Sequence, residues 1–278
     1  MTYKDLVNLD RYPIDRPGRE LDACLKDICA ELAEDGCAVL KNFLTRTPID
    51  ALTIEADAVA EYAHRSFNRT NAYFTKDDPS LPENDPRRKF FDRSNAFIPA
   101  DNFLHDGPLR TIHDAPGFDA FIRSCLQEEH FYRYADPLAD VIVNMAEAGS
   151  GFPWHFDTNN FTVTLAIQNA EVGGAFEYAA GIRDQDENFD EVSRVLDGRS
   201  ERITRLELEP GDLQLFRGRN SLHRVAPLAG NRPRYVAIFS YVEQPGMVGS
   251  PERTRQLYGR VLPIHLERAG LRADTFID

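Results

Sequence analysis

The sequence predicts an α+β fold in which helices from the N-terminal half pack on a β core of the sandwich or jelly-roll type. The first observation is that apolar residues recur at helical spacing over residues 18–35 and again from residue 47 onward. The second is a change of pattern at about residue 139, after which short apolar runs alternate with turn residues. About seven or eight short strands of this kind are typical of a sandwich or a jelly roll.

The first 66 residues are predicted to form two helices with a short strand between them. The first helix covers 18–35, because its apolar residues share one face, and it breaks at Asp35-Gly36. An apolar run over 37–40 follows and predicts a strand. Thr47-Pro48 places a proline in the first turn of the second helix, which we expect to run to about Ser66.

Residues 67–110 differ from their surroundings, because prolines and charges are interleaved with aromatic residues. An irregular segment of this length inside a compact protein is more often functional than filler, so we expect it to cover a site. Helical patterns return over 115–134 and over 251–271, and the second of these is expected to cover one open end of the core.

Strands are predicted at six places in the β half: 140–146, 161–167, 175–178, 203–208, 213–216 and 234–241. We expect one domain over residues 1–278. Its parts are helical support with a substrate-cover loop (1–135), a jelly-roll core (136–245) and a C-terminal helical cover (246–278).

Composition excludes several function classes. A net charge of −13 over 278 residues disfavours nucleic acid and anionic membrane surfaces as partners, because both attract basic proteins. No apolar run approaches the roughly 18 residues of a spanning helix, and residues 1–20 lack the apolar core of a signal peptide. The four cysteines show no CxxC spacing, which favours reduced thiols and a cytoplasmic location. A homodimer is compatible with the sequence, which does not determine the oligomeric state.

The most informative residues are His155 and Asp157, a His-X-Asp pair, together with His223 further along the chain. Two imidazoles and one carboxylate on one face of a ferrous ion leave three positions open, which suits an iron oxygenase. A zinc hydrolase more often keeps one open position. The alternative is that both histidines are hydrogen-bonded core residues. The remaining histidines lack this context and are expected to be structural or exposed: His64, His105, His113, His130 and His265.

An oxygenase of this kind also needs a cation for the far carboxylate of 2-oxoglutarate. Arginine suits the role, because its planar guanidinium matches a carboxylate with two parallel hydrogen bonds. Arg234 opens a predicted strand and shares a face with Val236 and Ile238. Arg232 lies in the preceding turn and is expected to be solvated, whereas Arg224 should point away from His223.

With these residues in place, the chain resembles the Fe(II)/2-oxoglutarate-dependent oxygenases over roughly residues 36–245. Within them it is most similar to the free-amino-acid radical halogenases and their hydroxylase relatives. Four segments carry this resemblance: 77–82 (DDPSLP), 134–139 (YADPLA), 154–157 (WHFD) and 172–178 (VGGAFEY). The resemblance implies a double-stranded β-helix core, with Fe(II), 2-oxoglutarate and O2 as cofactor and cosubstrates.

Asp157 determines which reaction the resemblance implies. In the halogenases of the group, glycine or alanine replaces the carboxylate ligand and chloride takes the vacated site. Because Asp157 is retained here, the resemblance implies a hydroxylase that releases succinate and CO2. The expected reaction is hydroxylation of an unactivated C–H bond in a small polar metabolite, such as a free amino acid or a derivative.

The substrate contacts are predicted from the 67–110 segment. Arg93 is expected to bind a substrate carboxylate, with Tyr73 and Asn95 nearby, although Arg93 in a salt bridge that anchors the loop is an equal alternative. Other outcomes stay open for the same site, namely desaturation, cyclisation or halogenation. Hydroxylation of a peptide would favour an open groove. A different class is a non-redox, cupin-like metal-binding protein, which would need neither Arg234 nor a cosubstrate.

Overall fold

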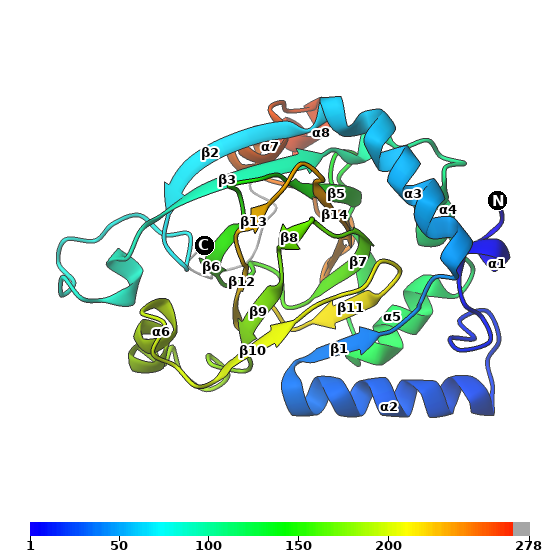
Figure 1. Ribbon diagram of the computed structural model, residues 1–278, viewed down its shortest axis with the longest axis horizontal. Coiled ribbons are helices and arrows are strands. Elements are labelled where there is room, and N and C mark those ends of the chain that lie inside the picture. The colour runs from blue at the N-terminus through cyan, green and yellow to red at the C-terminus, as the bar shows by residue number, and fades with distance from the viewer. Residues whose placement is uncertain (269–278) are drawn as a thin grey trace.

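The structure, a computed structural model, describes residues 1–268 apart from the side chain of Asn95 (Figure 1). Its α-helices are α1 (Tyr3–Leu6), α2 (Arg19–Asp35), α3 (Arg46–Val59), α4 (Pro108–His113), α5 (Phe118–Leu126), α6 (Phe189–Leu196), α7 (Pro251–Tyr258) and α8 (Pro263–Glu267). Short 3-10 helices are η1 (Ala60–Tyr62), η2 (Pro86–Arg88) and η3 (Ala100–Asn102). No helix in this described part of the chain combines the length and apolar character needed to cross a bilayer.

Two antiparallel sheets form the β half. The large sheet contains, in spatial order, β1 (Cys37–Leu40), β11 (Leu213–Phe216), β7 (Thr162–Gln168), β14 (Arg234–Phe239), β5 (Val141–Ala146), β3 (Phe91–Ile98) and β2 (His64–Thr70). The small sheet contains β10 (Ile203–Leu206), β9 (Phe176–Ala179), β12 (Leu222–Val225) and β6 (Phe152–His155). Two further pairs are β13 (Leu228–Ala229) with β8 (Val172–Gly173), and β15 (Tyr241–Val242) with β4 (Tyr132–Arg133).

The alternation of side chains along the large sheet separates the core from a cavity. Successive residues of a strand point to opposite faces. Val143, Leu165 and Ala237 therefore join the hydrophobic core beneath helices α2 to α5. Their even-numbered neighbours Asn144 and Val236 line a cavity that the small sheet closes from the other side. The predicted α+β class with an antiparallel β core is confirmed.

Helix α2 shows how local sequence sets a boundary. Its buried residues Ile28 and Leu32 lie one turn apart and pack in the core that α5 and the large sheet share. The helix ends at Gly36, whose φ of 63° is a left-handed conformation that glycine adopts without steric cost. The predicted helix over 18–35 and the predicted strand over 37–40 are both confirmed.

The prediction of a continuous irregular segment over 67–110 is wrong. Strands β2 and β3 form a hairpin that extends the large sheet, so the connecting loop covers only residues 71–90. Strand β2 lacks the alternation of apolar and polar residues that would have predicted it, because the exposed face of this edge strand mixes Phe67 with Arg65 and Arg69. The second predicted helix consequently ends early, at Val59.

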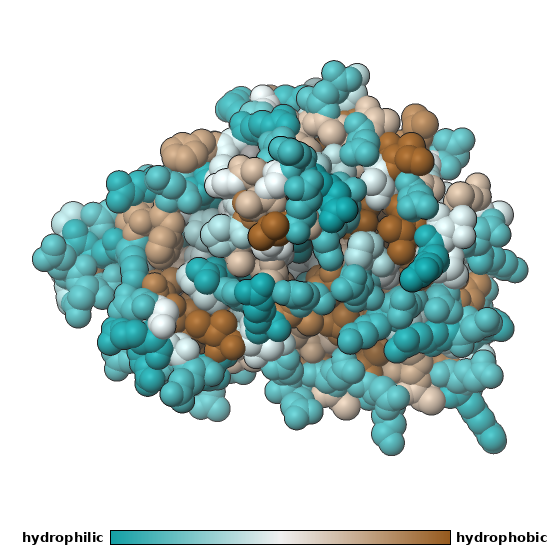
Figure 2. Space-filling model, viewed as in Figure 1, coloured by the Kyte–Doolittle hydropathy of each residue, from teal (hydrophilic) through white to brown (hydrophobic). Residues whose placement is uncertain are grey.

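Two other helical predictions are too long. The pattern over 115–134 yields only α5, because Gln127 adopts a left-handed conformation and ends the helix. The segment 251–271 breaks at Gly259 (φ 73°), and Pro263 starts the separate helix α8. The last three residues of that prediction, 269–271, lie outside the described residues. On the surface, hydrophilic side chains cover most of the face in Figure 2, and the apolar patches on it are small and separate.

His113 is a buried histidine that should make stability depend on pH. Its ring lies 5.5 Å from that of Phe239, and neither ring nitrogen has a hydrogen-bond partner within residues 1–268. Burial, helped by the charge of Arg133, lowers the pKa of His113 from 6.5 to about 4. Since the unfolded chain takes up this proton first, stability should fall as pH drops from 6.5 towards 4, by about 3 kcal/mol.

The substitution His113→Phe keeps an aromatic ring of similar size and removes the titration. We expect urea unfolding at pH 7 and pH 4.5 to show a smaller loss of stability in the variant than in the unchanged protein. An identical pH dependence in both proteins would show that His113 is not the group responsible.

Candidate metal centre

The three residues of the predicted metal motif come together in one place. His155 at the end of β6 lies directly opposite His223 on β12 in the antiparallel register, and their ring centroids are 4.2 Å apart. Oδ1 of Asp157 is 3.7 Å from Nε2 of His155 and 3.4 Å from Nε2 of His223. The three ligand atoms lie within 4.8 Å of one another. This grouping is expected of ligands that share one metal ion.

Asp157 lies outside the strand that carries His155, although two residues spaced in this way on one strand would share a face. Strand β6 ends at His155, and Asp157 begins the following loop. Its backbone N–H donates to the carbonyl oxygen of Gly218 at 3.1 Å, which joins this loop to the one between β11 and β12. The carboxylate thus reaches the two imidazoles from a loop rather than from the sheet.

Backbone carbonyls orient both imidazoles. Nδ1 of His155 is 2.8 Å from the carbonyl oxygen of Pro153, and Nδ1 of His223 is 2.9 Å from that of Ser221. Because a carbonyl only accepts, each Nδ1 carries a hydrogen, and each Nε2 faces the Asp157 side. Burial and the neighbouring His223 also lower the pKa of His155, which keeps it neutral. An imidazole whose Nδ1 is fixed in this way is oriented to bind a metal through Nε2.

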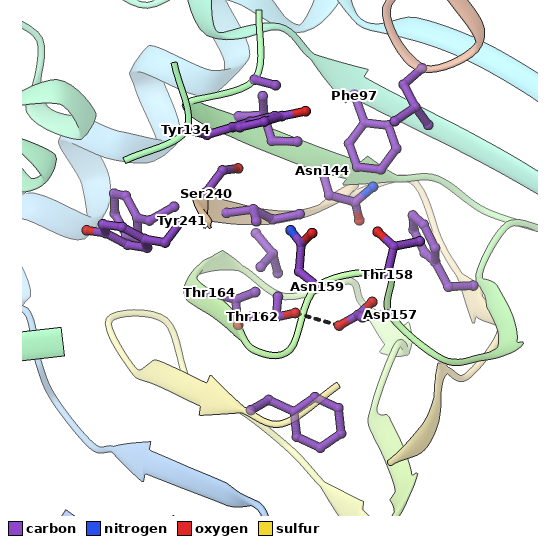
Figure 3. Close-up of a pocket in the computed structure, with 18 of the residues that line it drawn as sticks. Phe97, Tyr134, Asn144, Asp157, Thr158, Asn159, Thr162, Thr164, Ser240 and Tyr241 are labelled. Carbon is purple, nitrogen blue, oxygen red and sulfur yellow. Dashed lines mark hydrogen bonds between the residues drawn. The ribbon is translucent and has the colours of Figure 1, made fainter. Parts of the chain in front are cut away.

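Asp157 is held in its ionised form. Burial alone would raise the pKa of Asp157, but His223 and His155 and the hydroxyl of Thr162 outweigh burial and hold it well below the usual range. Thr162 Oγ1 donates to Oδ2 of Asp157, as Figure 3 shows. That contact leaves Oδ1 to face the imidazoles. Two imidazoles and one carboxylate are a donor set that fits a ferrous ion.

The metal residues open into a cavity of about 260 Å³ between the two sheets, close to the lower end of the roughly 300–1,000 Å³ typical of small-molecule sites. Polar side chains from the large sheet and from the loop after Asp157 face into it: Asn144, Thr158, Asn159, Thr162, Thr164 and Gln214 (Figure 3).

Arg234 lies in the same cavity, at the start of β14, and is only 7% exposed. Burial lowers the pKa of Arg234 to about 10, and none of the carboxylates within residues 1–268 forms an ion pair with it. A Cβ on Gly174 would lie 3.2 Å from Cδ of Arg234, so this glycine leaves room for the arginine chain. A buried cation without a counter-charge is costly, which suits the binding of an anionic ligand.

The two other arginines near the motif lie as the sequence indicates. Arg224 pairs with Glu177 at 2.6 Å and stacks over the Trp154 ring at 4.7 Å, and none of the three lines the cavity. Arg232 is exposed and donates to the carbonyl oxygen of Asn169.

Of the predicted substrate residues, the structure places Arg93 at the cavity but not Tyr73. Arg93 lines the cavity, and its guanidinium lies over the rings of Phe74 at 4.6 Å and Phe152 at 5.2 Å. Burial, helped by the charge of Arg253, lowers the pKa of Arg93 to about 9. Tyr73 is not among the residues that line the cavity, and its ring packs in a separate hydrophobic cluster with Phe156 and Phe189. The prediction for Asn95 concerns a side chain outside the described part of the structure.

Phe74 and Arg253 line the cavity although the sequence had not singled them out. The Phe74 ring lies 5.6 Å from that of His155, and the Arg253 guanidinium lies 5.9 Å from the centre of the Phe74 ring. Phe74 has a φ of 57°, an unusual conformation that no sequence pattern signals. Arg253 was detectable only as a cation on the helix predicted to cover the open end.

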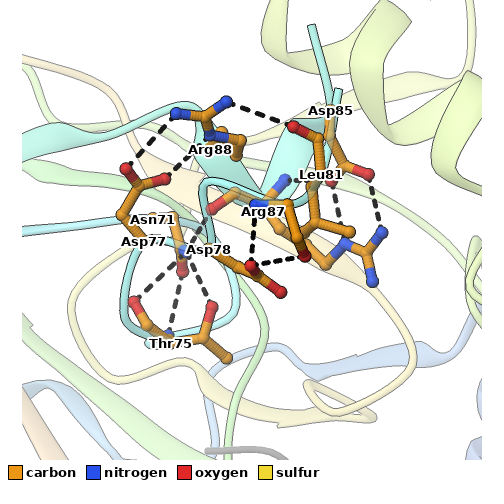
Figure 4. A network of polar contacts seen from close by, with 9 residues as sticks. Asn71, Thr75, Asp77, Asp78, Leu81, Asp85, Arg87 and Arg88 are labelled. Atoms are coloured by element: carbon orange, nitrogen blue, oxygen red, sulfur yellow. Dashed lines mark hydrogen bonds and ion pairs between the residues drawn. The ribbon is translucent and has the colours of Figure 1, made fainter. Parts of the chain in front are cut away.

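A polar network holds Phe74 in this conformation. Oδ1 of the buried Asn71 accepts from the backbone N–H groups of Tyr73 and Thr75, each at 3.0 Å. Its Nδ2 donates to Oγ1 of Thr75 at 2.8 Å and to the carbonyl oxygen of Arg87. Ion pairs Asp85–Arg87 and Asp77–Arg88 tie down the rest of the loop (Figure 4). These contacts fix the conformation of the loop, from which Phe74 lines the cavity.

Comparison with known proteins agrees with this geometry. The family model of halogenase D matches residues 22–250. No curated protein matches the sequence. Among solved structures, the chain is similar to the non-heme alpha-ketoglutarate-dependent epimerase SnoN (14% identity, 80% of this chain and 82% of that one, TM-score 0.57). It is also similar to the carbocyclase SnoK (13%, 80% and 87%, 0.53) and to AviO1 from Streptomyces viridochromogenes Tue57 (14%, 80% and 96%, 0.52).

At these identities the likeness to solved structures shows the fold alone. The fold is that of the solved alpha-ketoglutarate-dependent enzymes, as the predicted oxygenase superfamily requires. The narrower resemblance to enzymes of free amino acids stays a prediction.

Proposed function

The chain belongs to the halogenase D family, and on that premise we propose that it is an Fe(II)- and 2-oxoglutarate-dependent hydroxylase of a small, amino-acid-like substrate. One observation carries the proposal. The carboxylate of Asp157 and the two Nε2 atoms of His155 and His223 converge in the cavity that also holds the buried Arg234. We further propose that the two sheets form a double-stranded β-helix within a single domain.

Each residue has a stated task in this proposal. His155 and His223 offer Nε2, and Asp157 offers Oδ1 while Thr162 holds its other oxygen. Arg234 pairs with the far carboxylate of 2-oxoglutarate, which supplies a counter-charge to this buried guanidinium. Together with dioxygen, the bound iron and 2-oxoglutarate supply oxidation of a C–H bond, and the cosubstrate becomes succinate and CO2.

Asp157 favours hydroxylation over halogenation. A halide would need the position beside the two imidazoles, and an ionised carboxylate occupies it. Two anions at that position would also repel each other. A non-redox metal-binding protein is a weaker candidate, because it gives no reason for a buried Arg234 in the same cavity without an ion-pair partner among residues 1–268.

The substrate proposal rests on the positive charge beside the metal residues. Arg93 and Arg253 both approach the ring of Phe74, and the repulsion between them helps to lower the pKa of Arg93. A carboxylate between them would relieve that repulsion. We therefore propose a small carboxylate-bearing substrate, such as a free amino acid, rather than a nucleic acid or a membrane, and Asn95 stays a proposed contact.

The proposal is tested first without oxygen. Anaerobic addition of Fe(II) and 2-oxoglutarate should produce a visible metal-to-ligand charge-transfer band, and a featureless spectrum would contradict the assignment. Succinate release is then scored over a panel of free amino acids, with mass spectra of the products. A gain of one oxygen indicates hydroxylation, a loss of two hydrogens indicates desaturation or cyclisation, and a halogen isotope pattern indicates halogenation.

Arg93→Met should weaken substrate binding more than cosubstrate binding. Hydrogen bonds to a charged group contribute about 1.5–3 kcal/mol, so the KM for the amino acid should rise roughly 10- to 100-fold. The charge-transfer band should be unchanged. Arg69→Met, at an exposed position on the paired strand β2, is the matched control.

Amidation of the substrate carboxylate gives a second comparison for Arg93. The amide should bind the unchanged protein as weakly as the acid binds the Arg93→Met variant, and the two changes should not add. Additive losses would mean that Arg93 only anchors the loop.

A further inference from the structure

Gly218 lies unusually close to the proposed metal ligand Asp157. It belongs to the loop between β11 and β12, and its carbonyl oxygen accepts from the N–H of Asp157. A Cβ built on Gly218 would lie 1.9 Å from Oδ2 of Asp157, 2.7 Å from its Cγ and 2.9 Å from its Cβ. The backbone of Gly218 is not in the left-handed region, so an alanine there would meet no backbone strain. The Asp157 side chain is what an added methyl group would meet.

The carboxylate cannot simply turn aside. Rotation about the bond to Cγ would move Oδ2, but Cγ and Cβ of Asp157 would still lie closer than carbon atoms approach without repulsion. Thr162 holds Oδ2 from the other side, and the backbone hydrogen bond joins the two loops. A methyl group at Gly218 would therefore displace the whole carboxylate from the two imidazoles.

We infer that Gly218 is a positioning residue for Asp157, and that the two residues together determine which anion can stand beside the imidazoles. This inference rests on the proposed function, in which Asp157 is a ligand. When the Asp157 carboxylate is present, it occupies the space that a side chain at position 218 would fill. With the carboxylate removed, the same space between Gly218 and the Thr162 hydroxyl would admit a small anion, and a methyl group on Gly218 would close it.

The test compares Gly218→Ala, Asp157→Gly and the double variant with the unchanged protein. Glycine is used at 157, because the Cβ of an alanine there would still lie 2.9 Å from the new methyl group. Cobalt(II), which does not support turnover, is the probe, and the readouts are its affinity and its visible spectrum. The matched control is the double variant compared with Asp157→Gly, since there the methyl group of Gly218→Ala meets no Asp157 side chain.

We expect Gly218→Ala to weaken cobalt binding at least about tenfold in the otherwise unchanged protein, comparable to the loss of a residue that orients a ligand. In the Asp157→Gly background the same change should have little effect on cobalt affinity. Equal losses in both backgrounds, or no loss in either, would overturn the inference. Urea unfolding of the metal-free proteins is a test that needs no metal binding. Gly218→Ala should lower the free energy of unfolding in the otherwise unchanged protein, and it should have little effect in the Asp157→Gly background. This comparison distinguishes failure of the inference from failure of the proposed function, because it applies even if the unchanged protein binds no metal.

Sodium chloride provides the second measurement. Chloride should shift the cobalt spectrum of the Asp157→Gly protein, and the shift should disappear in the double variant. Two outcomes would overturn the inference that Gly218 and Asp157 share one space: a chloride-induced shift that persists in the double variant, or an Asp157→Gly spectrum that does not respond to chloride.

Discussion

Replacement of Asp157 by alanine should abolish hydroxylation while the fold is retained. The substitution removes the only carboxylate that the structure places, within residues 1–268, beside the two imidazoles. Residues that merely orient metal ligands cost roughly 10–100-fold in affinity or activity when they are changed. Loss of a proposed ligand should therefore exceed about 100-fold in product formation, measured by mass spectrometry of the hydroxylated product alongside succinate release.

Two comparisons make the Asp157→Ala result specific. Asp50→Ala, at an exposed position on α3, removes the same charge far from the cavity and should leave turnover unchanged. Far-ultraviolet circular dichroism should show that both variants are folded. If Asp157→Ala protein hydroxylates at the normal rate, Asp157 does not belong to the metal shell and the assignment of the site is wrong.

Arg234→Gln should raise the concentration of 2-oxoglutarate needed for half-maximal activity by roughly 10- to 100-fold. The amide keeps a hydrogen-bond donor but removes the charge that a carboxylate would meet. The requirement for Fe(II), measured separately by titration of activity, should hardly change, because Arg234 makes no contact with the proposed ligands.

The same substitution should not destabilise the protein in the absence of cosubstrate. Burial lowers the pKa of Arg234 from 12.5 to about 10, so keeping the guanidinium charged in the cavity costs on the order of 3 kcal/mol of folding free energy. Arg234→Gln removes that cost, whereas Arg232→Gln, in the exposed turn beside it, should affect neither stability nor the 2-oxoglutarate requirement. Parallel losses in stability, iron use and cosubstrate use would indicate a folding defect instead.

Much of the site was predictable because its chemistry and its strand pattern coincide. Two histidines and an aspartate are scarce residues in a recognisable spacing, and Arg234 shares a strand face with Val236 and Ile238, which also line the cavity. The substrate contacts were less predictable. Tyr73 and Phe74 are adjacent aromatic residues, and only the left-handed turn at Phe74 decides which ring faces the metal residues.

By itself, the sequence determined the α+β class, the main strands, and the residue types for one metal ion and one dicarboxylate, because periodicity and side-chain chemistry are local properties. Tertiary structure alone decided that β2 and β3 extend the large sheet, that Arg253 and Arg93 both approach the Phe74 ring, and that Gly218 leaves space for Asp157. Those features depend on contacts between segments far apart in the chain, and no local pattern encodes the distance between two loops.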